Sequence, residues 1–288
     1  MLFLKLRKWS DMNKKIIITF VAVLLLAPVS WLVLYANTIL ENKSNSVPYP
    51  FYNDKLASQH LVAHAGGWID NRVYTNSREA VERSIKQGRK YIEIDMIETS
   101  DGHYVAAHDW ELVNKMLGKE SSAPLSLNEF KNAKLYDKYT TMSVKDVAEL
   151  MEKYPDWYLL TDKIRDIDYL KENLYYPDRI IVQTFGLLGY FKALKLGFKY
   201  PVLRLKGGRR GIKEIYKIFM NLGNIKGVIL GEKSFNKNKD YIGKLHNNGV
   251  SVILYGNPSF EIVENAKAIK GLLYKYIDLV DSDSLSKL

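Results

Sequence analysis

Histidine, glycine and acidic residues occur at the ends of short apolar segments in this 288-residue chain. The segment 61–65, LVAHA, contains His64 and is followed directly by Gly66 and Gly67. Because glycines let backbone amides approach a ligand closely, this turn favours contact with an anion such as phosphate. Taken alone, the pattern is more typical of a core histidine beside a turn.

Two carboxylates share one face of the segment 91–97, YIEIDMI. Side chains alternate between the two faces of a strand, so Glu93 and Asp95 are expected to point to the same side. Buried carboxylates are costly unless a cation lies nearby. An arginine or lysine from a neighbouring strand would meet this need, and so would a metal ion. Since the chain has no cysteine, oxygen ligands favour Mg²⁺ or Ca²⁺ over zinc.

His108 lies six residues after the turn sequence SDG at residues 100–102. The run HYVAAHDW is expected to be extended and to carry His108 back toward the strand ends. Asp109 or a backbone group would then fix the tautomer of the His108 imidazole. His108 is therefore a candidate for proton transfer.

The segment 157–162, WYLLTD, ends in Asp162 and is followed by Lys163. Neighbours in a strand point to opposite faces, so these two charges are not expected simply to neutralise each other. Asp162 would complete an oxygen-rich cation site with Glu93 and Asp95, and Lys163 would offer a positive charge to a phosphate oxygen. A structural salt-bridged pair is the alternative.

Apolar segments alternate with amphipathic ones along the chain. The predicted strands cover residues 61–65, 91–97, 157–162, 179–184, 201–205, 227–230, 250–255 and 277–281. The predicted helices cover residues 76–87, 143–155, 187–196, 212–222, 239–247 and 260–269. This α/β alternation predicts a (β/α)8 TIM barrel, in which the active site lies at the carboxyl ends of the strands. A doubly wound open sheet is the alternative.

In their order and spacing, the motifs HAGG, YTNS, IEIDMIETSDG, HD and TDK resemble those of the glycerophosphodiester phosphodiesterase family. This family is part of the phosphatidylinositol-phospholipase-C-like phosphodiesterase superfamily. The resemblance runs from about Leu61 to the last strand, and its specific motifs lie before Lys163. It implies hydrolysis of a phosphodiester, with a divalent cation held by three acidic residues and with two histidines serving as acid and base.

The chain departs from the family pattern at two positions. In the family the first histidine lies in a His-Arg-Gly motif. His64, Ala65 and Gly66 occupy these positions here, so alanine replaces the arginine, which in the family is expected to contact phosphate. The family's third acidic ligand typically lies two residues before the strand-end lysine, where this chain has Thr161. Asp162 is expected to take over as the third ligand.

The resemblance and the residue patterns together define one candidate site. Asn76 matches a family asparagine that braces the site, and Arg204, at a predicted strand end, is a candidate substitute for the missing arginine, with core-capping or surface roles as alternatives. The predicted catalytic residues are His64, His108 and Lys163; the predicted metal ligands are Glu93, Asp95 and Asp162; the predicted substrate contacts are Gly66, Gly67, Asn76 and Arg204.

The first forty residues form a separate unit. Residues 1–15 contain five lysines or arginines and one acid, and residues 16–40 are an uncharged apolar run. This run is long enough to cross about 30 Å of hydrocarbon as a helix. It predicts a single-pass anchor in the cell membrane, with a polar linker at 41–57 and an extracytoplasmic barrel at 58–288. Cleavage as a signal peptide is the alternative.

Composition narrows the possible partners. Residues 1–15 carry +4 of the formal net charge of +10, and the remaining +6 suits an anionic substrate or surface but is equally typical of a solvated face. Long Lys/Arg runs and RNA-binding aromatic motifs are missing, which argues against nucleic acid. A small-molecule or lipid-derived phosphodiester is the expected substrate, the membrane is contacted through the N-terminal helix, and no obligate protein partner is inferred. The alternatives are a phosphatidylinositol-type phospholipase C or lyase, and a non-catalytic anchored barrel that acts as a binding module.

Overall fold

The computed structural model describes residues 49, 61–205, 225–255 and 272–276. The predicted cytoplasmic segment 1–15 and anchor 16–40 lie outside these residues, as do the predicted helices 212–222 and 260–269. Within the described part of the chain, each helix is too short or too polar to cross a bilayer.

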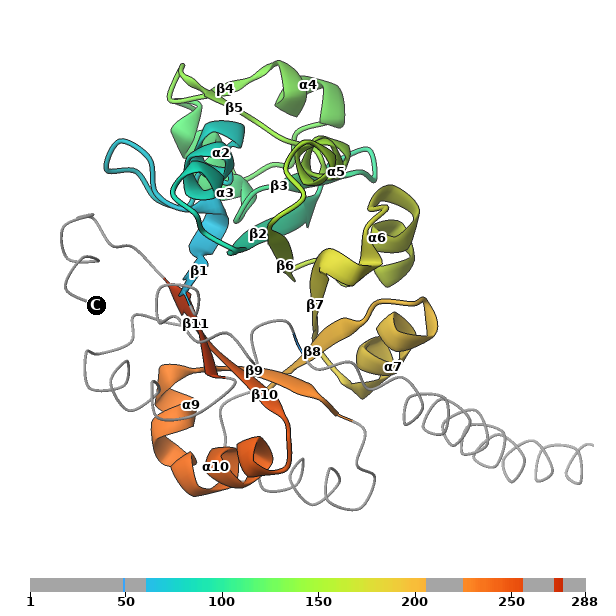
Figure 1. The fold of residues 1–288 in the computed structure, drawn as a ribbon. Helices are drawn as coiled ribbons and strands as arrows, with labels where there is room; N and C mark the ends of the chain where they lie inside the picture. The colour runs from blue at the N-terminus through green and yellow to red at the C-terminus, as the bar shows by residue number, and fades with distance from the viewer. Residues whose placement is uncertain (1–48, 50–60, 206–224, 256–271, 277–288) are drawn as a thin grey trace, which may run out of the picture. The chain divides into compact units, whose positions relative to one another are not determined.

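Eight parallel strands pair in a closed order. They are β1 (Leu61–Ala63), β2 (Tyr91–Glu98), β6 (Tyr158–Asp162), β7 (Ile180–Thr184), β8 (Tyr200–Arg204), β9 (Gly227–Gly231), β10 (Ser251–Tyr255) and β11 (Leu272–Tyr276). Each pairs in parallel with the next, β11 pairs with β1, and β1 also pairs with β2, as the labels in Figure 1 allow the reader to follow. The fold is therefore a TIM-barrel-like α/β fold, whereas an open doubly wound sheet would lack the β11–β1 pairing.

The last strand corrects the sequence prediction. The strand that closes the ring is Leu272–Tyr276, whereas the sequence predicts 277–281, which lies outside the described residues. The other seven strands lie within one or two residues of their predicted bounds.

Helices follow most of the strands. They are η2 (His64–Gly66), α2 (Arg78–Lys86), α3 (Trp110–Met116), α4 (Leu127–Asn132), α5 (Val144–Lys153), α6 (Ile167–Asn173), η3 (Pro177–Arg179), α7 (Leu187–Lys195), α9 (Glu232–Lys237) and α10 (Lys239–Asn247). The amphipathic pattern of α5 predicts its buried face, and the Ser143–Asp146 capping box predicts its start; both are present.

A short excursion lies between β2 and α5. β3 (Tyr104–Ala106) runs antiparallel to β2 after the predicted turn, and α3, α4 and the small hairpin β4 (Lys134–Leu135) and β5 (Tyr139–Thr140) follow it. A separate apolar cluster that includes Val105 and Phe130 holds this excursion together.

The side chains inside the barrel change from apolar to polar along the strands. An apolar cluster fills one level; its buried members are Tyr49, Val62, Tyr91, Leu160, Ile181, Tyr200, Val202, Ile229 and Ile253. Two residues further toward the carboxyl ends, the same faces carry His64, Glu93, Asp162, Gln183, Arg204 and Tyr255. Side chains on one face of a strand recur every second residue, so a layer of polar side chains lies directly above the apolar layer inside the barrel.

Candidate active site

His64 lies just beyond β1, in the one-turn helix η2. Its Nε2 atom is 3.7 Å from Oε2 of Glu93. Ala65 has a left-handed backbone with φ 50° and directs its amide to the same Oε2 atom at 2.7 Å. The turn after β1 therefore donates a backbone hydrogen bond to the Glu93 carboxylate and places the His64 imidazole beside it.

The two glycines allow the turn to pack closely against α2. Gly66 and Gly67 have φ of 81° and 94°, a region that strongly favours glycine. A Cβ atom on Gly67 would lie 2.2 Å from Oγ of Ser84, and that hydroxyl donates a hydrogen bond to the Gly66 carbonyl. The Gly67 amide donates to the His64 carbonyl at 2.8 Å, so this donor serves the turn itself.

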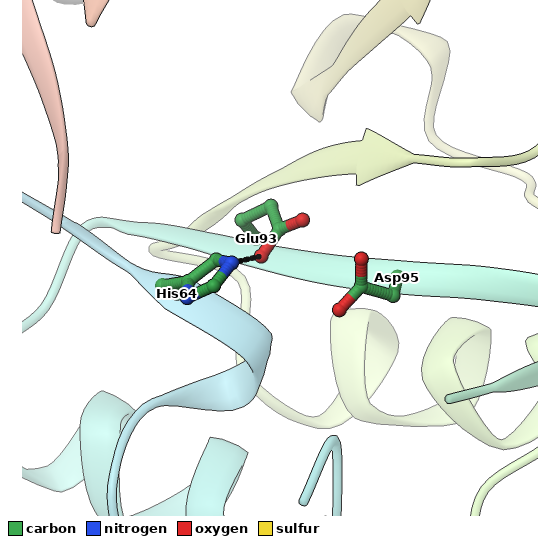
Figure 2. Close-up of side chains that lie close together, drawn as sticks. All are labelled: His64, Glu93 and Asp95. Atoms are coloured by element: carbon green, nitrogen blue, oxygen red, sulfur yellow. Dashed lines mark ion pairs between the residues drawn. The ribbon is translucent and has the colours of Figure 1, made fainter. Parts of the chain in front are cut away.

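Glu93 and Asp95 extend from the same face of β2, and His64 faces them from the end of β1 (Figure 2). One ligand atom from each of His64, Glu93 and Asp95 can be chosen so that all lie within 4.8 Å of one another. Both carboxyl side chains are buried. The predicted pairing of the two acids on one face is thus present, and His64 joins them in a group that could hold a metal ion.

Asn76 braces the second of these acids. Its Nδ2 atom donates to Oδ2 of Asp95 at 3.2 Å, and the Asp95 amide donates to Oδ1 of Asn76 at 3.1 Å. Asn76 is fully buried and has φ 47°, a conformation that asparagine tolerates better than most residues. These hydrogen bonds agree with the expectation that Asn76 braces the site, and its contact with substrate stays a prediction.

Asp162 has different partners from those expected of a metal ligand. The register of β2 with β6 sets it beside Asp95, on the same face of the sheet. Its Oδ1 atom accepts hydrogen bonds from Nε2 of Gln183 and from the Lys163 amide, and it lies 3.6 Å from a guanidinium nitrogen of Arg204. Among the described residues, the group suited to a metal contains His64 in place of Asp162.

Lys163 turns toward the barrel mouth. It has φ 66°, and the Ile164 amide donates to the Asp162 carbonyl at 2.8 Å across it, which closes a three-residue turn. The extended alternation assumed from the sequence therefore ends at Asp162. As a result, Nζ of Lys163 donates to the backbone carbonyl of His108.

His108 is oriented by the next residue. Its Nδ1 atom lies 2.5 Å from Oδ2 of Asp109, whose Oδ1 caps α3 by accepting from the Leu112 amide. Burial raises the pKa of Asp109, but the hydrogen bonds from Leu112 and His108 outweigh it and leave the pKa below its ordinary value. A carboxylate can only accept, so Nδ1 of His108 carries the proton and Nε2 is the atom available to a substrate.

Tyr74 lies between the two histidines and is not part of the predicted site. Its ring centroid is 4.8 Å from that of His64 and 5.0 Å from that of His108, with steep interplanar angles of 84° and 73°. Its φ of 59° is unusual for a bulky residue. The tyrosine in the YTNS motif was the available signal, but nothing in its spacing indicated contact with both imidazoles.

Arg204 lies at the end of β8, where it contacts two aromatic rings as well as Asp162. Its guanidinium is 4.9 Å from the Tyr255 ring centroid and 5.6 Å from that of Phe185, and it donates to the Tyr255 hydroxyl at 3.4 Å. Together these contacts hold a guanidinium at the polar level of the barrel.

Comparison with known proteins connects this geometry with a family. Residues 69–174 match the sequence model of the glycerophosphoryl diester phosphodiesterase family, which confirms the resemblance found in the motifs. This family consists of phosphoric diester hydrolases. The chain matches no curated protein sequence.

Solved structures with the same fold share little sequence with this chain. A putative glycerophosphodiester phosphodiesterase from Galdieria sulphuraria has a TM-score of 0.59 at 16% identity, covering 80% of this chain and 95% of its own. A glycerophosphodiester phosphodiesterase from Parabacteroides distasonis has a TM-score of 0.59 at 17% identity, covering 79% and 94%. An Oleispira antarctica phosphodiesterase in complex with the product sn-glycerol-3-phosphate has a TM-score of 0.58 at 14% identity, covering 74% and 92%.

Proposed function

We propose that this chain, whose residues 69–174 place it among the glycerophosphoryl diester phosphodiesterases, hydrolyses a glycerophosphodiester with the help of a divalent cation. The observation that carries the proposal is the cluster at the carboxyl ends of the strands, where the carboxylates of Glu93 and Asp95, the proposed cation ligands, lie within 4.8 Å of the imidazole of His64, the proposed proton donor. The product bound to the Oleispira protein supports a glycerol phosphate group as part of the substrate.

Glu93 and Asp95 would hold the cation. Two carboxylates are a donor set suited to Mg²⁺ or Ca²⁺, and both are fixed beforehand, Glu93 by the Ala65 amide and Asp95 by Asn76. When bound, the cation would supply positive charge to the phosphoryl oxygens. We do not include Asp162 among the cation ligands, because its carboxylate already forms an ion pair with Arg204 and accepts a hydrogen bond from Gln183.

The two histidines would move the protons. His108, with Nδ1 committed to Asp109, would take a proton at Nε2 from the attacking water or glycerol hydroxyl. As the attacking oxygen bonds to phosphorus and the bond from phosphorus to the leaving oxygen breaks, His64, protonated at the start of the step, would give its proton to the leaving alkoxide from the other side of Tyr74. Lys163 and Arg204 would balance the charge on the non-bridging oxygens.

The test is a metal-supplemented assay against a panel of glycerophosphodiesters with analysis of the products. His64→Ala and His108→Ala should each lower kcat by about 100-fold or more, whereas His103→Ala, at an exposed position beside the SDG turn, should not. A chelator should abolish activity reversibly. If both histidine variants keep near-wild-type rates, the acid-base assignment is wrong.

Further measurements distinguish cation binding from proton transfer, and the proposed hydrolase from the two alternative functions. Glu93→Gln and Asp95→Asn should remove the rise in Tm that the cation causes, while His108→Ala should keep it. A cyclic phosphate product with weak metal dependence would indicate a lyase of the phosphatidylinositol-phospholipase type. Substrate binding without turnover of any diester would indicate a binding module.

We also propose that residues 16–40 anchor the enzyme in the cell membrane with the barrel outside. The uncharged run and its basic flank at residues 1–15 support this orientation. Protease treatment of intact cells should then degrade the barrel, and protection of the barrel would contradict the proposal.

A further inference from the structure

A cavity of about 250 Å³ adjoins the candidate active site between the loops that follow β6 and β7. It is lined by Ile164, Arg165, Ile167, Gln183, Thr184, Phe185, Gly186 and Gly189. This volume is below the range of about 300–1,000 Å³ that is typical of sites for whole drug-sized ligands. The cavity is therefore suited to one part of a substrate.

Gln183 links the cavity to the catalytic residues. It lines the cavity, and its Nε2 atom donates to the carboxylate of Asp162, which pairs with Arg204. A substrate with its phosphodiester near His64 and Arg204 would therefore have this cavity beside it.

The charged groups around the cavity favour an anion. The guanidiniums of Arg165 and Arg204 lie 4.8 Å and 5.6 Å from the Phe185 ring centroid. Asp162 pairs with Arg204, whereas no carboxylate among the described residues forms an ion pair with the exposed Arg165. The nearest acid in sequence, Asp166, accepts from the Tyr169 amide as the cap of α6. Arg165 therefore brings to the cavity a positive charge that is not paired with any carboxylate of the described residues.

We propose that this cavity is a subsite for a second anionic group. The preferred substrate is then a phosphodiester in which one of the two esterified alcohols carries an additional phosphate group. Ile164 and Ile167, both buried, form the apolar part of the lining together with Phe185, and Arg165 supplies the charge. A guanidinium is suited to this task because it binds phosphate in a bidentate manner. This inference rests on the proposed phosphodiesterase function and names its substrate class.

Two probes distinguish the subsite from the catalytic centre. One is glycerophosphoglycerol, and the other is the same molecule with a phosphomonoester on its terminal glycerol. The wild-type chain should hydrolyse the phosphorylated probe with the higher kcat/KM. Arg165→Ala should lower kcat/KM at least about 10-fold for the phosphorylated probe, a loss of about 1.4 kcal/mol, and less than 2-fold for the other. Lys171→Ala removes a charge from an exposed position of the neighbouring α6 and should affect neither.

Calorimetry in the presence of a chelator tests the subsite without turnover. The phosphorylated probe should bind more tightly than the unphosphorylated one, and Arg165→Ala should remove that advantage. Equal losses for both probes, or no loss, would overturn the subsite while leaving the phosphodiesterase proposal intact. If the wild-type chain hydrolyses neither probe nor any other diester, the phosphodiesterase function fails, and the calorimetric comparison still decides whether the cavity binds phosphate.

Discussion

Tyr74 contacts both of the histidines to which we assign the proton transfers. Its ring packs edge-on against both imidazoles, so removing it should let each one leave its working orientation. We expect Tyr74→Leu to lower kcat by about 10-fold or more with a smaller change in KM, because positioning of catalytic groups acts mainly on the chemical step.

Tyr74→Phe keeps the ring and should retain most of the turnover. The two variants should be compared by steady-state kinetics over a range of pH, since displaced imidazoles would also shift the limbs of the pH profile. A loss in Tyr74→Phe as large as that in Tyr74→Leu would mean that the hydroxyl, and not the ring, carries the effect.

Strand alternation predicts the positions of single side chains best. Glu93 and Asp95 lie on one face because β2 is regular over its whole length. Alternation also places Asp162 beside Asp95, but it does not apply to Lys163, because β6 ends at Asp162 and a turn with φ 66° redirects the lysine. The partner of Asp162 is Arg204 on β8, a long-range pair that local spacing does not indicate.

At the scale of elements, Asp146 connects three helices around the excursion. It completes the capping box of α5 with Ser143, and it pairs with Arg78 of α2 at 3.5 Å and with Lys131 of α4 at 3.4 Å. Burial raises the pKa of Asp146, but the hydrogen bonds from Ser143 and the charge of Lys131 outweigh it, so the pKa lies below its ordinary value. The ionised form of Asp146 therefore stabilises the folded state.

The acid dependence of stability follows from this shift. Because the folded pKa is lowered, the contribution of Asp146 is present above the pKa of an unfolded aspartate, about 3.9, and is lost as the pH falls through the folded value. Asp146→Ala should lower the free energy of unfolding at pH 7 by about 1–3 kcal/mol, and the difference from wild type should narrow toward pH 2. Urea unfolding at several pH values measures this, with Glu152→Ala, at an exposed position of the same helix, as control. A difference that stays constant with pH would contradict the role of the charge.

The elements that the sequence missed are short. α3, α4 and α6 have seven, six and seven residues, so a helical period hardly repeats within them. Their N-terminal caps Asp109, Ser126 and Asp166 were the better signal, and Ser126 with Glu129 even forms a capping box. Longer elements such as α5 show several turns of apolar stripe and were predicted nearly to their ends.

At the scale of the whole barrel, a residue from the predicted linker 41–57 belongs to the core. Tyr49 packs against Tyr200 at 5.3 Å between ring centroids and donates a hydrogen bond to the Pro201 carbonyl. A Cβ atom on Gly227 would lie 2.6 Å from the Tyr49 hydroxyl, so the glycine makes room for it. The polar composition of 41–57 gave no sign of this contact, which spans 152 positions of sequence.

The buried tyrosines should make the barrel sensitive to alkali. Burial raises the pKa of Tyr49 well above its ordinary value and that of Tyr190 to about 12. An unfolded tyrosine ionises near pH 10, so between pH 10 and 12 the unfolded state holds fewer protons than the folded state and stability falls as the pH rises.

The expected slope is about 1.4 kcal/mol per pH unit for each such tyrosine. Tyr190→Phe should be less stable than wild type at pH 8, because it loses the hydrogen bond from the Lys226 amide, yet its free energy of unfolding should fall less steeply above pH 10. Urea unfolding followed by circular dichroism at pH 8, 10 and 11 measures both effects, and Tyr175→Phe, 69% exposed, serves as the control with an unchanged slope. Parallel curves for Tyr190→Phe and wild type would show that Tyr190 ionises as readily in the folded barrel as in the unfolded chain, and the alkaline sensitivity would then have to come from other groups.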